Sequence, residues 1–193
     1  MRALLLALAT LAALSGASSA HAGSLAIDGV KYEPTASVAG QTLRLNGAAT
    51  KHNKLGVRNF AVSVYVQTPV HTTEALLAAP GPKRISFAFL RTVQADAMGF
   101  LTKGVQSNMD RSDYSKTFSG VMQLGALLGG HPSFSDGDSF AMDYQPGVGT
   151  TFLINGKPQG EAVKEPEFFK AMLLIWLGPK PADPQMKVAL LAG

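Results

Sequence analysis

Alternation of apolar and polar residues predicts the strands of this chain. Across residues 60–66 every second position is Phe or Val, so one side of a predicted strand is wholly apolar while Tyr65 lies on the other. Residues 83–90 repeat the pattern, with Ile and Phe at alternate positions. Weaker alternation predicts further strands at residues 24–30, 41–46, 139–144 and 150–154.

Apolar residues spaced three and four apart predict the helices. A short helix is expected at residues 72–79, where Pro80 ends it, and longer ones at residues 93–107 and 112–128. Residues 166–177 form the most apolar predicted helix. It begins with a proline, which suits a first helical turn, and a Gly-Pro pair ends it. A short amphipathic tail follows.

The helix at residues 166–177 limits what the protein can be. At about 1.5 Å per residue it is too short to cross a bilayer. Its apolar face must therefore pack inside the domain, either in a filled core or as the wall of an apolar pocket. These two alternatives lead to different functions.

The order of the elements indicates the fold class. Strands come first, then helices, then a hairpin and a final helix, which is typical of an α+β fold. Asn155-Gly156 is the strongest turn signal and predicts the hairpin. We expect an antiparallel sheet with helices packed on one face. Residues 23–193 contain no internal repeat and no linker, and they predict a single domain.

Residues 1–22 have the features of a cleaved signal peptide. Arg2 supplies a positive start, an apolar run follows, and Ala20-His21-Ala22 matches the small-x-small cleavage pattern. We therefore expect an exported protein, with the periplasm favoured over the extracellular medium. The sequence has no second long apolar segment, so we predict no transmembrane helix. The absence of cysteine excludes disulfides and lipid attachment at a cysteine.

Charge and motifs exclude several classes of function. The formal net charge is only +4 and the basic residues form no run, so nothing predicts a nucleic-acid surface. His52, His71 and His131 lack the spacing of a zinc site, and we expect no metal and no cofactor. Residues 147–149 and 136–138 resemble a phosphate loop and a carboxylate pair, but each has the composition of a turn.

Four polar side chains remain as candidates for ligand binding. Tyr65 would line a cleft if helices covered its side of the strand, or would be a half-buried core residue with its hydroxyl at the rim. Arg91 stands between a strand and a helix, where it could hold an anion or pair with a carboxylate. Lys51 and Arg58 flank a loop, and either could donate a charge-assisted hydrogen bond to a ligand carboxylate. An unbroken strand would place Arg58 and Tyr65 on opposite faces.

Six short motifs follow one another in a characteristic order and spacing. They are Leu45-Asn46-Gly47-Ala48, Val62-x-Val64-Tyr65-Val66, Phe89-Leu90-Arg91, Gly147-x-Gly149-Thr150, Ile154-Asn155-Gly156 and Phe169-x-x-Met172-Leu173-x-Ile175-Trp176-Leu177-Gly178. Together they resemble the chalcone isomerase-like proteins, in particular their exported bacterial branch, and the resemblance covers about residues 30–191. The resemblance implies an open-faced sandwich, in which a large antiparallel sheet is backed by helices.

The resemblance implies the fold more strongly than the activity. The plant enzymes close a flavanone ring in a cleft that uses an Arg, a Thr, a Tyr and an Asn. At the Arg position this chain has Lys51 or, if an insertion displaces it, Arg58, and Lys does not replace a bidentate Arg. The Tyr, Asn and Thr positions fall near Asp96, Lys103 and Pro158. Most of the catalytic residues of the enzymes are therefore absent.

We expect a non-catalytic protein that binds a small apolar ligand with an anionic end, like a fatty acid, in a cleft between sheet and helices. Lys51, Arg58 or Arg91 would meet the anion, and Tyr65 would donate a hydrogen bond. Two alternatives stay open. An isomerase or intramolecular lyase acting on another substrate requires a converging group of polar residues. An envelope interaction protein without a ligand predicts a filled interior and an exposed apolar patch.

Overall fold

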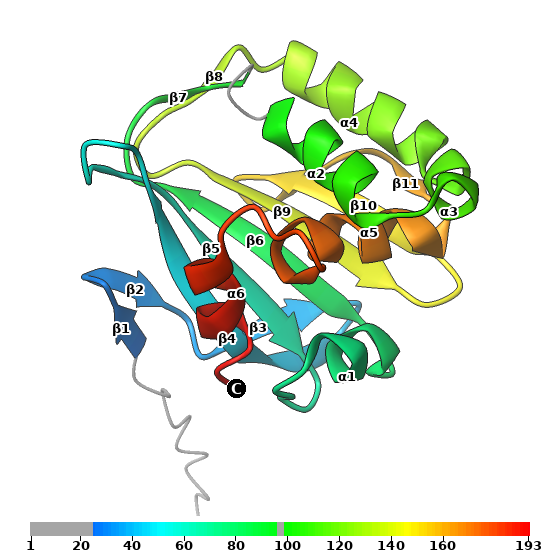
Figure 1. Ribbon diagram of the computed structural model, residues 1–193, viewed down its shortest axis with the longest axis horizontal. Coiled ribbons are helices and arrows are strands. Elements are labelled where there is room, and N and C mark those ends of the chain that lie inside the picture. The colour runs from blue at the N-terminus through cyan, green and yellow to red at the C-terminus, as the bar shows by residue number, and fades with distance from the viewer. Residues whose placement is uncertain (1–24, 96–98) are drawn as a thin grey trace, which may run out of the picture.

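The computed structural model describes residues 25–95 and 99–193. Its centre is a curled antiparallel sheet of seven strands in the order β11-β10-β9-β6-β5-β4-β3 (Figure 1). The strands of this sheet are β3 (Thr35–Val38), β4 (Gln41–His52), β5 (Arg58–Val66), β6 (Lys83–Phe89), β9 (Ser139–Gln145), β10 (Gly149–Ile154) and β11 (Lys157–Val163).

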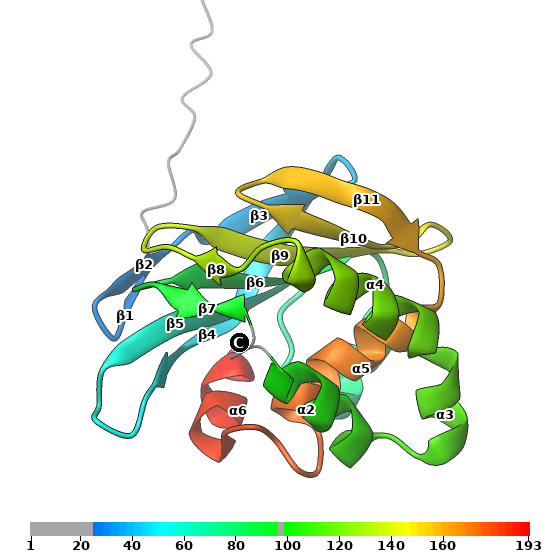
Figure 2. The ribbon, with the colours of Figure 1, turned by 90° about the horizontal axis from the view of Figure 1, so that it is seen from above.

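The helices form a layer on one side of this sheet (Figure 2). α5 packs against α1, α2, α3 and α6 and also contacts β9 and β10, so it is the centre of the layer. The helices are α1 (Thr73–Ala78), α2 (Phe100–Asn108), α3 (Arg111–Lys116), α4 (Phe118–Gly129), α5 (Pro166–Leu177) and α6 (Pro184–Leu190). The predicted fold class, an antiparallel sheet with helices packed on one face, is confirmed.

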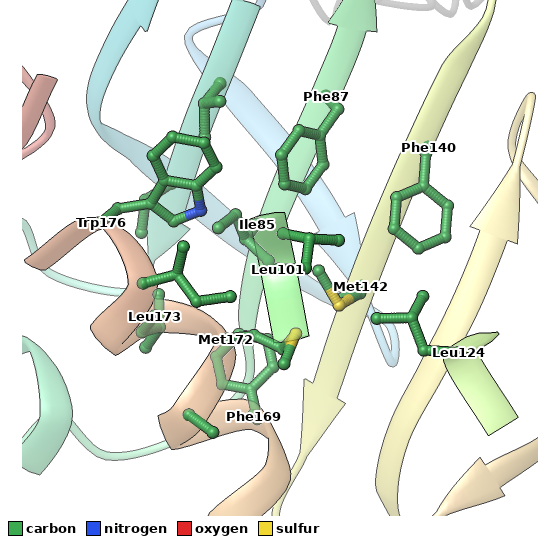
Figure 3. Packing of buried hydrophobic residues seen from close by; sticks show 14 of the residues in the cluster. Ile85, Phe87, Leu101, Leu124, Phe140, Met142, Phe169, Met172, Leu173 and Trp176 are labelled. Atoms are coloured by element: carbon green, nitrogen blue, oxygen red, sulfur yellow. The ribbon is translucent and has the colours of Figure 1, made fainter. Parts of the chain in front are cut away.

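The main core lies between the sheet and the helical layer. Cross-strand pairs such as Val64 with Ile85 and Val62 with Phe87 line the sheet side of this core. Every residue from Phe168 to Leu177 of α5 is buried except Lys170. Figure 3 shows Trp176 of α5 facing this sheet surface. The apolar stripe predicted on residues 60–66 is therefore the side that meets the helices.

The opposite face of the sheet is also largely covered. A hairpin of β1 (Leu25–Ile27) and β2 (Val30–Tyr32) packs over one part of it, and the curled edge strand β3 contacts β6 and β9. Arg84, on this face of β6, forms an ion pair of 2.5 Å with Asp143, which lies opposite it on the neighbouring strand β9. Every residue from Phe60 to Val66 is buried, so β5 is covered on both faces.

Two element predictions were wrong because a turn was missed. Residues 24–30 were predicted as one strand, but Asp28 (φ 52°) and Gly29 (φ 70°) form the turn between β1 and β2. Residues 112–128 were predicted as one helix, but the segment divides into α3 and α4 at Thr117. The buried Thr117 hydroxyl donates to the carbonyl of Tyr114 at 2.7 Å, and such a local bond competes with the helix.

The predicted helix at residues 93–107 is half correct. α2 begins only at Phe100, and Val93 instead lies in the two-residue strand β7 (Val93–Gln94), which pairs with β8 (Ser133–Phe134). Phe134 stacks on Phe89 at a ring-centroid distance of 4.4 Å. Contact with a distant segment therefore overrides the helical spacing at the start of this stretch. The remaining predicted helices and strands appear with small changes at their ends, except that β4 continues to His52, six residues past its predicted end; β3 and β8 had not been predicted.

The predictions of export and of a leader concern residues 1–22, which lie outside the described residues. Within the described part of the chain, no helix is long and apolar enough to cross a membrane.

Candidate functional site

A pocket of about 250 Å³ lies between the sheet and the helical layer, close to the start of β5. We call it the Lys51 pocket. Its walls come from five different elements and from the link before α6. The lining residues are Lys51, Asn59, Phe60, Val93, Phe100, Trp176 and Ala182. All except Lys51 and Asn59 are apolar or aromatic residues.

Three aromatic side chains form the wall of the Lys51 pocket. Phe60 is the first residue of the apolar stripe of β5, and its ring stacks on that of Phe100 at a centroid distance of 6.1 Å. Trp176, in the last turn of α5, meets both rings edge-on, at 6.3 Å from Phe60 and 5.5 Å from Phe100. Edge-on and stacked pairs at these distances are favourable, so the wall is preformed.

The Trp176 indole nitrogen is buried in the core (Figure 3). The side chain is only 1% exposed, and its Nε1 has no hydrogen-bond partner among the described residues. A buried donor without a partner is energetically unfavourable. The apolar spacing of residues 166–177 predicted burial of this residue, but it could not show that the indole N–H would lack a partner.

Lys51 provides the cation of the pocket. Its Nζ forms an ion pair of 2.8 Å with Asp183 Oδ2, and the two side chains are 33% and 25% exposed. The hydrogen bond from Lys51 is the main cause that lowers the pKa of the Asp183 carboxyl. Asp183 also caps α6 through the backbone N–H groups of Gln185 and Met186. The cation is thus held at the pocket by a carboxylate that is itself fixed at a helix start.

The position of Asp183 follows from the Asn46-Gly47 motif in β4. The buried Asn46 side chain donates to the carbonyl of Leu190 at 2.9 Å and accepts from the N–H of Val70 at 2.7 Å. At Gly47 a Cβ would lie 2.4 Å from the carbonyl oxygen of Ala189. Only glycine therefore lets α6 approach β4 this closely, and this contact keeps Asp183 beside Lys51.

The other predicted basic residues lie away from the pocket lining. Arg58 is exposed at the start of β5 and donates to the carbonyl of Asp28 at 3.1 Å, next to the β1–β2 hairpin. Arg91 is exposed in the segment that follows β6. Of the four predicted site residues, the structure brings only Lys51 to this pocket.

Tyr65 is a correction to the predicted geometry. It was expected to face the cleft if helices covered its side of the strand, but the helices cover the other side. Tyr65 is 6% exposed on the face covered by β3, packs against Val38 and Leu43, and donates to the carbonyl of Glu33 at 3.1 Å. Burial raises the pKa of its phenol. It is a core residue, as in the alternative interpretation, but it is fully buried rather than half-buried.

The positions at which the plant enzymes carry catalytic groups do not converge on this pocket. Lys103 is exposed on α2 and Pro158 is exposed on β11, and neither lines the pocket. Asp96 lies outside the described residues. Lys51 and Asn59 are therefore the polar residues of the described pocket lining.

A second and larger pocket, of about 540 Å³, lies beside the first half of α5, and we call it the Lys83 pocket. Lys83 was missed as a site residue, although the sequence contains a signal for it. It precedes Ile85, Phe87 and Phe89 in the alternation of β6, so parity alone places it on the side that meets the helices.

An exposed apolar patch is also present, as the interaction alternative requires. Phe118 and Met122, one turn apart on α4, are 61% and 58% exposed. The other requirement of that alternative is a filled interior; the residues of the main core are all buried, and the two pockets lie beside this core.

Comparisons with known proteins give a family and a fold. A family model described as chalcone isomerase-like matches residues 24–192. Among solved structures, a fatty-acid binding protein of Arabidopsis thaliana is similar, with a TM-score of 0.65 and 15% sequence identity over 88% of this chain and 96% of that chain. At this identity the likeness shows the fold alone. No curated protein sequence matches the chain.

Proposed function

We propose that this chain, which belongs to the chalcone isomerase-like family, binds a small apolar molecule with an anionic end in the Lys51 pocket and catalyses no reaction on it. One observation carries the proposal: an ammonium group lines a pocket whose wall is formed by Phe60, Phe100 and Trp176. Apolar walls with few oriented polar groups are typical of small-molecule sites.

The contacts of Lys51 explain how an anion would bind. A lysine ammonium carries three N–H donors, of which the structure uses one for Asp183. A ligand carboxylate would take a second donor, or would displace Asp183 toward the solvent. Competition from Asp183 keeps the expected affinity moderate.

The pocket volume limits the ligand. At about 250 Å³ it is slightly smaller than most small-molecule sites, which measure roughly 300–1,000 Å³. We therefore propose an amphipathic acid of medium chain length, such as decanoate. The likeness to a fatty-acid binding protein supports this class of ligand.

The same reasoning supports a non-catalytic role. Stabilising an enolate requires several donors that converge on one oxygen atom. The described lining offers Lys51, already paired, and Asn59, and the enzyme positions Lys103 and Pro158 lie elsewhere. We place the protein in the exported bacterial branch of the family. If residues 1–22 are cleaved on export, as their pattern predicts, the ligand would be carried in the periplasm.

The intrinsic fluorescence of the protein tests this proposal. Trp176 is the only tryptophan of the chain and lines the Lys51 pocket, so its emission reports occupancy of this pocket. Titration with decanoate is expected to shift the emission with saturation. Decanol, which has the same chain without the charge, is expected to bind about tenfold or more weakly, because a hydrogen bond to a charged group contributes about 1.5–3 kcal/mol.

Two variants serve as test and matched control. Lys51→Met should weaken decanoate binding by about ten- to hundredfold, whereas Arg58→Gln, at an exposed cation outside the pocket, should leave it unchanged. Emission that does not respond to decanoate, or equal affinity of the wild type and Lys51→Met, would contradict the proposal. Extraction of the natively purified protein, followed by mass spectrometry, would identify a natural ligand.

A further inference from the structure

The Lys83 pocket combines apolar walls with a deeply buried cation. Lys83, the first residue of β6, is only 5% exposed. Its ammonium lies 5.5 Å from the centre of the Tyr144 ring, and Tyr144 stacks on Phe169 of α5 at 5.2 Å. The complete lining is Leu77, Ala79, Pro80, Gly81, Lys83, Asp113, Tyr144, Pro146, Pro166, Glu167, Phe169, Lys170 and Leu173.

Lys83 has no acidic partner in the described part of the chain. Its Nζ donates to the carbonyl of Ala79, which follows α1, and it forms no ion pair with a described residue. Burial lowers the pKa of this ammonium. A buried charge without a counter-charge is costly, because the low-dielectric surroundings replace its hydration only in part.

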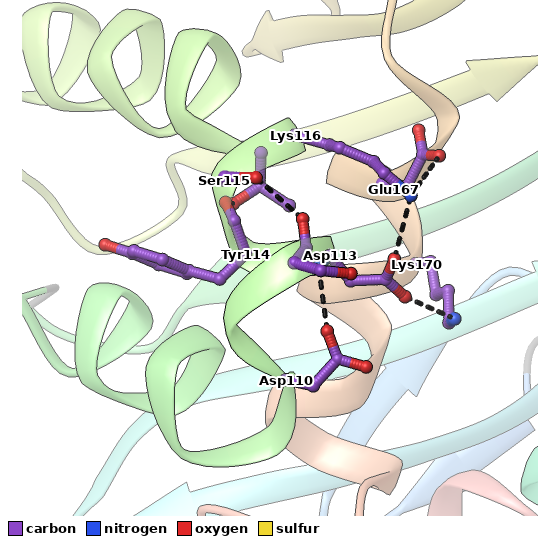
Figure 4. A network of polar contacts seen from close by, with 9 residues as sticks. Asp110, Asp113, Tyr114, Ser115, Lys116, Glu167 and Lys170 are labelled. Atoms are coloured by element: carbon purple, nitrogen blue, oxygen red, sulfur yellow. Dashed lines mark hydrogen bonds and ion pairs between the residues drawn. The ribbon is translucent and has the colours of Figure 1, made fainter.

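The acidic residues of the lining are already used by other lysines (Figure 4). Asp113 pairs with Lys116 at 3.0 Å and with Lys170 at 3.4 Å, while Glu167 lies 3.8 Å from Lys116. These pairs form a network between α3 and the first turns of α5, at the rim of the pocket. They neutralise one another and leave Lys83 as the uncompensated charge of the pocket.

From this arrangement we propose that the Lys83 pocket is a second binding site, which takes a small apolar molecule bearing a carboxylate. The carboxylate would pair with the Lys83 ammonium, and the apolar body would contact Tyr144, Phe169 and Leu173. The volume of about 540 Å³ lies within the usual range of roughly 300–1,000 Å³ for small-molecule sites. The site is separate from the Lys51 pocket, since the two share no lining residue.

A structural role for Lys83 is the competing explanation. Its bond to the carbonyl of Ala79 satisfies an acceptor at the end of α1, as lysines near helix ends often do. This bond uses one of three donors and supplies no negative charge. The two roles differ in one consequence: only a binding site makes the affinity for an anion depend on Lys83.

Nuclear magnetic resonance can read the two pockets separately. Tyr144 lines the Lys83 pocket but not the Lys51 pocket, so its ring signals distinguish occupancy of these two pockets in the full protein. It also lines a neighbouring pocket with Lys164, so the signals of Phe169 and Leu173, which line the Lys83 pocket and not that neighbour, should move together with it. Titration with decanoate is expected to move these signals with saturation and to raise the pKa of Lys83, followed at its Cε–H signals. Decanol is expected to bind at least tenfold more weakly.

Variants complete the test. Lys83→Met should weaken decanoate binding at Tyr144 by about ten- to hundredfold, whereas Lys103→Gln, at an exposed cation that lines neither pocket, should leave it unchanged. Lys51→Met should leave it unchanged. Tyr144 signals that stay still at millimolar decanoate, or equal affinity in the wild type and Lys83→Met, would overturn the proposal and leave Lys83 as a helix cap. If Lys83→Met does not fold, the pKa of Lys83 in the wild type decides: a pKa unchanged by decanoate overturns the proposal.

Discussion

The two pockets along α5 present a lysine in opposite ways. Lys51 is 33% exposed and already paired with Asp183, beside a pocket of about 250 Å³. Lys83 is 5% exposed and has no acidic partner among the described residues, beside a pocket of about 540 Å³. A paired cation must give up or share its acidic partner to bind an anion. An unpaired buried cation instead gains its first negatively charged partner when the anion binds. The comparison shows that the burial of a lysine and its acidic partners, and not its charge alone, decide how it can bind an anionic ligand.

Truncating the aromatic wall of each pocket should separate the two sites most strongly. Trp176→Ala removes a wall of the Lys51 pocket, and Phe169→Ala removes a wall of the Lys83 pocket. Each substitution should lower the free energy of unfolding by about 3–5 kcal/mol, because a large buried side chain is lost. Urea denaturation measures this loss.

Binding in the same two variants shows whether the pockets are independent. Trp176→Ala should keep decanoate at the Lys83 pocket, as seen by the Tyr144 signals. Phe169→Ala should keep decanoate at the Lys51 pocket, as seen by Trp176 emission. Loss of both sites in each variant, while both remain folded, would mean that the pockets act as one.

Asp183→Asn should make Lys51 resemble Lys83. The substitution removes the carboxylate that competes for Lys51 but keeps a side chain that caps α6 well. Decanoate affinity measured by Trp176 emission should rise by about tenfold, since a charged hydrogen-bond partner is released. Decanol affinity should stay the same and serves as the control. An unchanged decanoate affinity would show that Asp183 does not compete for the cation.

The sequence predicted much of the fold because that information is local. The alternation in residues 60–66, the proline-started helix at residues 166–177 and the turn at Asn155-Gly156 depend on neighbours within a few residues. The turn is present as expected, with φ of 49° and 74° at its two positions. Long-range contacts explain the failures. Val93 lies in a strand because it pairs with Phe134, which is 41 positions away in the printed sequence.

The site was harder to predict because alternation along a strand shows only which residues share a face of the sheet. It does not show which face the helices cover. It correctly placed Tyr65 opposite the Val residues of β5, but it could not tell which face the helices cover. Both faces of β5 are buried, so apolar content did not decide between them. Lys83 could have been recognised, since it shares the parity of Ile85 and Phe87. Its missing counter-charge depends on α3 and α5 and was beyond the reach of the sequence.

Lys83 should change how the stability of the protein depends on pH. Burial lowers the pKa of Lys83. Between that lowered pKa and the ordinary value of about 10.4, the unfolded chain binds a proton that the folded chain has released. Stability therefore rises with pH across this window in the wild type, relative to Lys83→Met.

Comparison with the variant is needed because other groups also titrate. Burial raises the pKa of Tyr32 and Tyr65, so above pH ~10 these residues lower stability as the pH rises. Tyr144, Asp113, Glu167 and Lys170 also face the pocket and are common to both proteins. Urea denaturation at a series of alkaline pH values measures the difference. A wild type and Lys83→Met that follow parallel curves would contradict the shifted titration of Lys83.

The smallest effect is expected at the rim of the Lys83 pocket. Lys170 is 44% exposed and pairs with Asp113 at 3.4 Å. Exposed pairs contribute about 0–1 kcal/mol, so Lys170→Gln should lower the free energy of unfolding by less than ~1 kcal/mol. Moderate salt should reduce the effect further. A larger loss would mean that the network between α3 and α5 stabilises the helical layer more than its exposure indicates.

A crystal structure of the protein with decanoate tests the central claim most directly. We expect a decanoate carboxylate within hydrogen-bond distance of Lys51 Nζ, with the chain against Phe60, Phe100 and Trp176. A Lys51 pocket that stays empty at saturating decanoate, or a decanoate whose carboxylate points to the solvent, would contradict the claim.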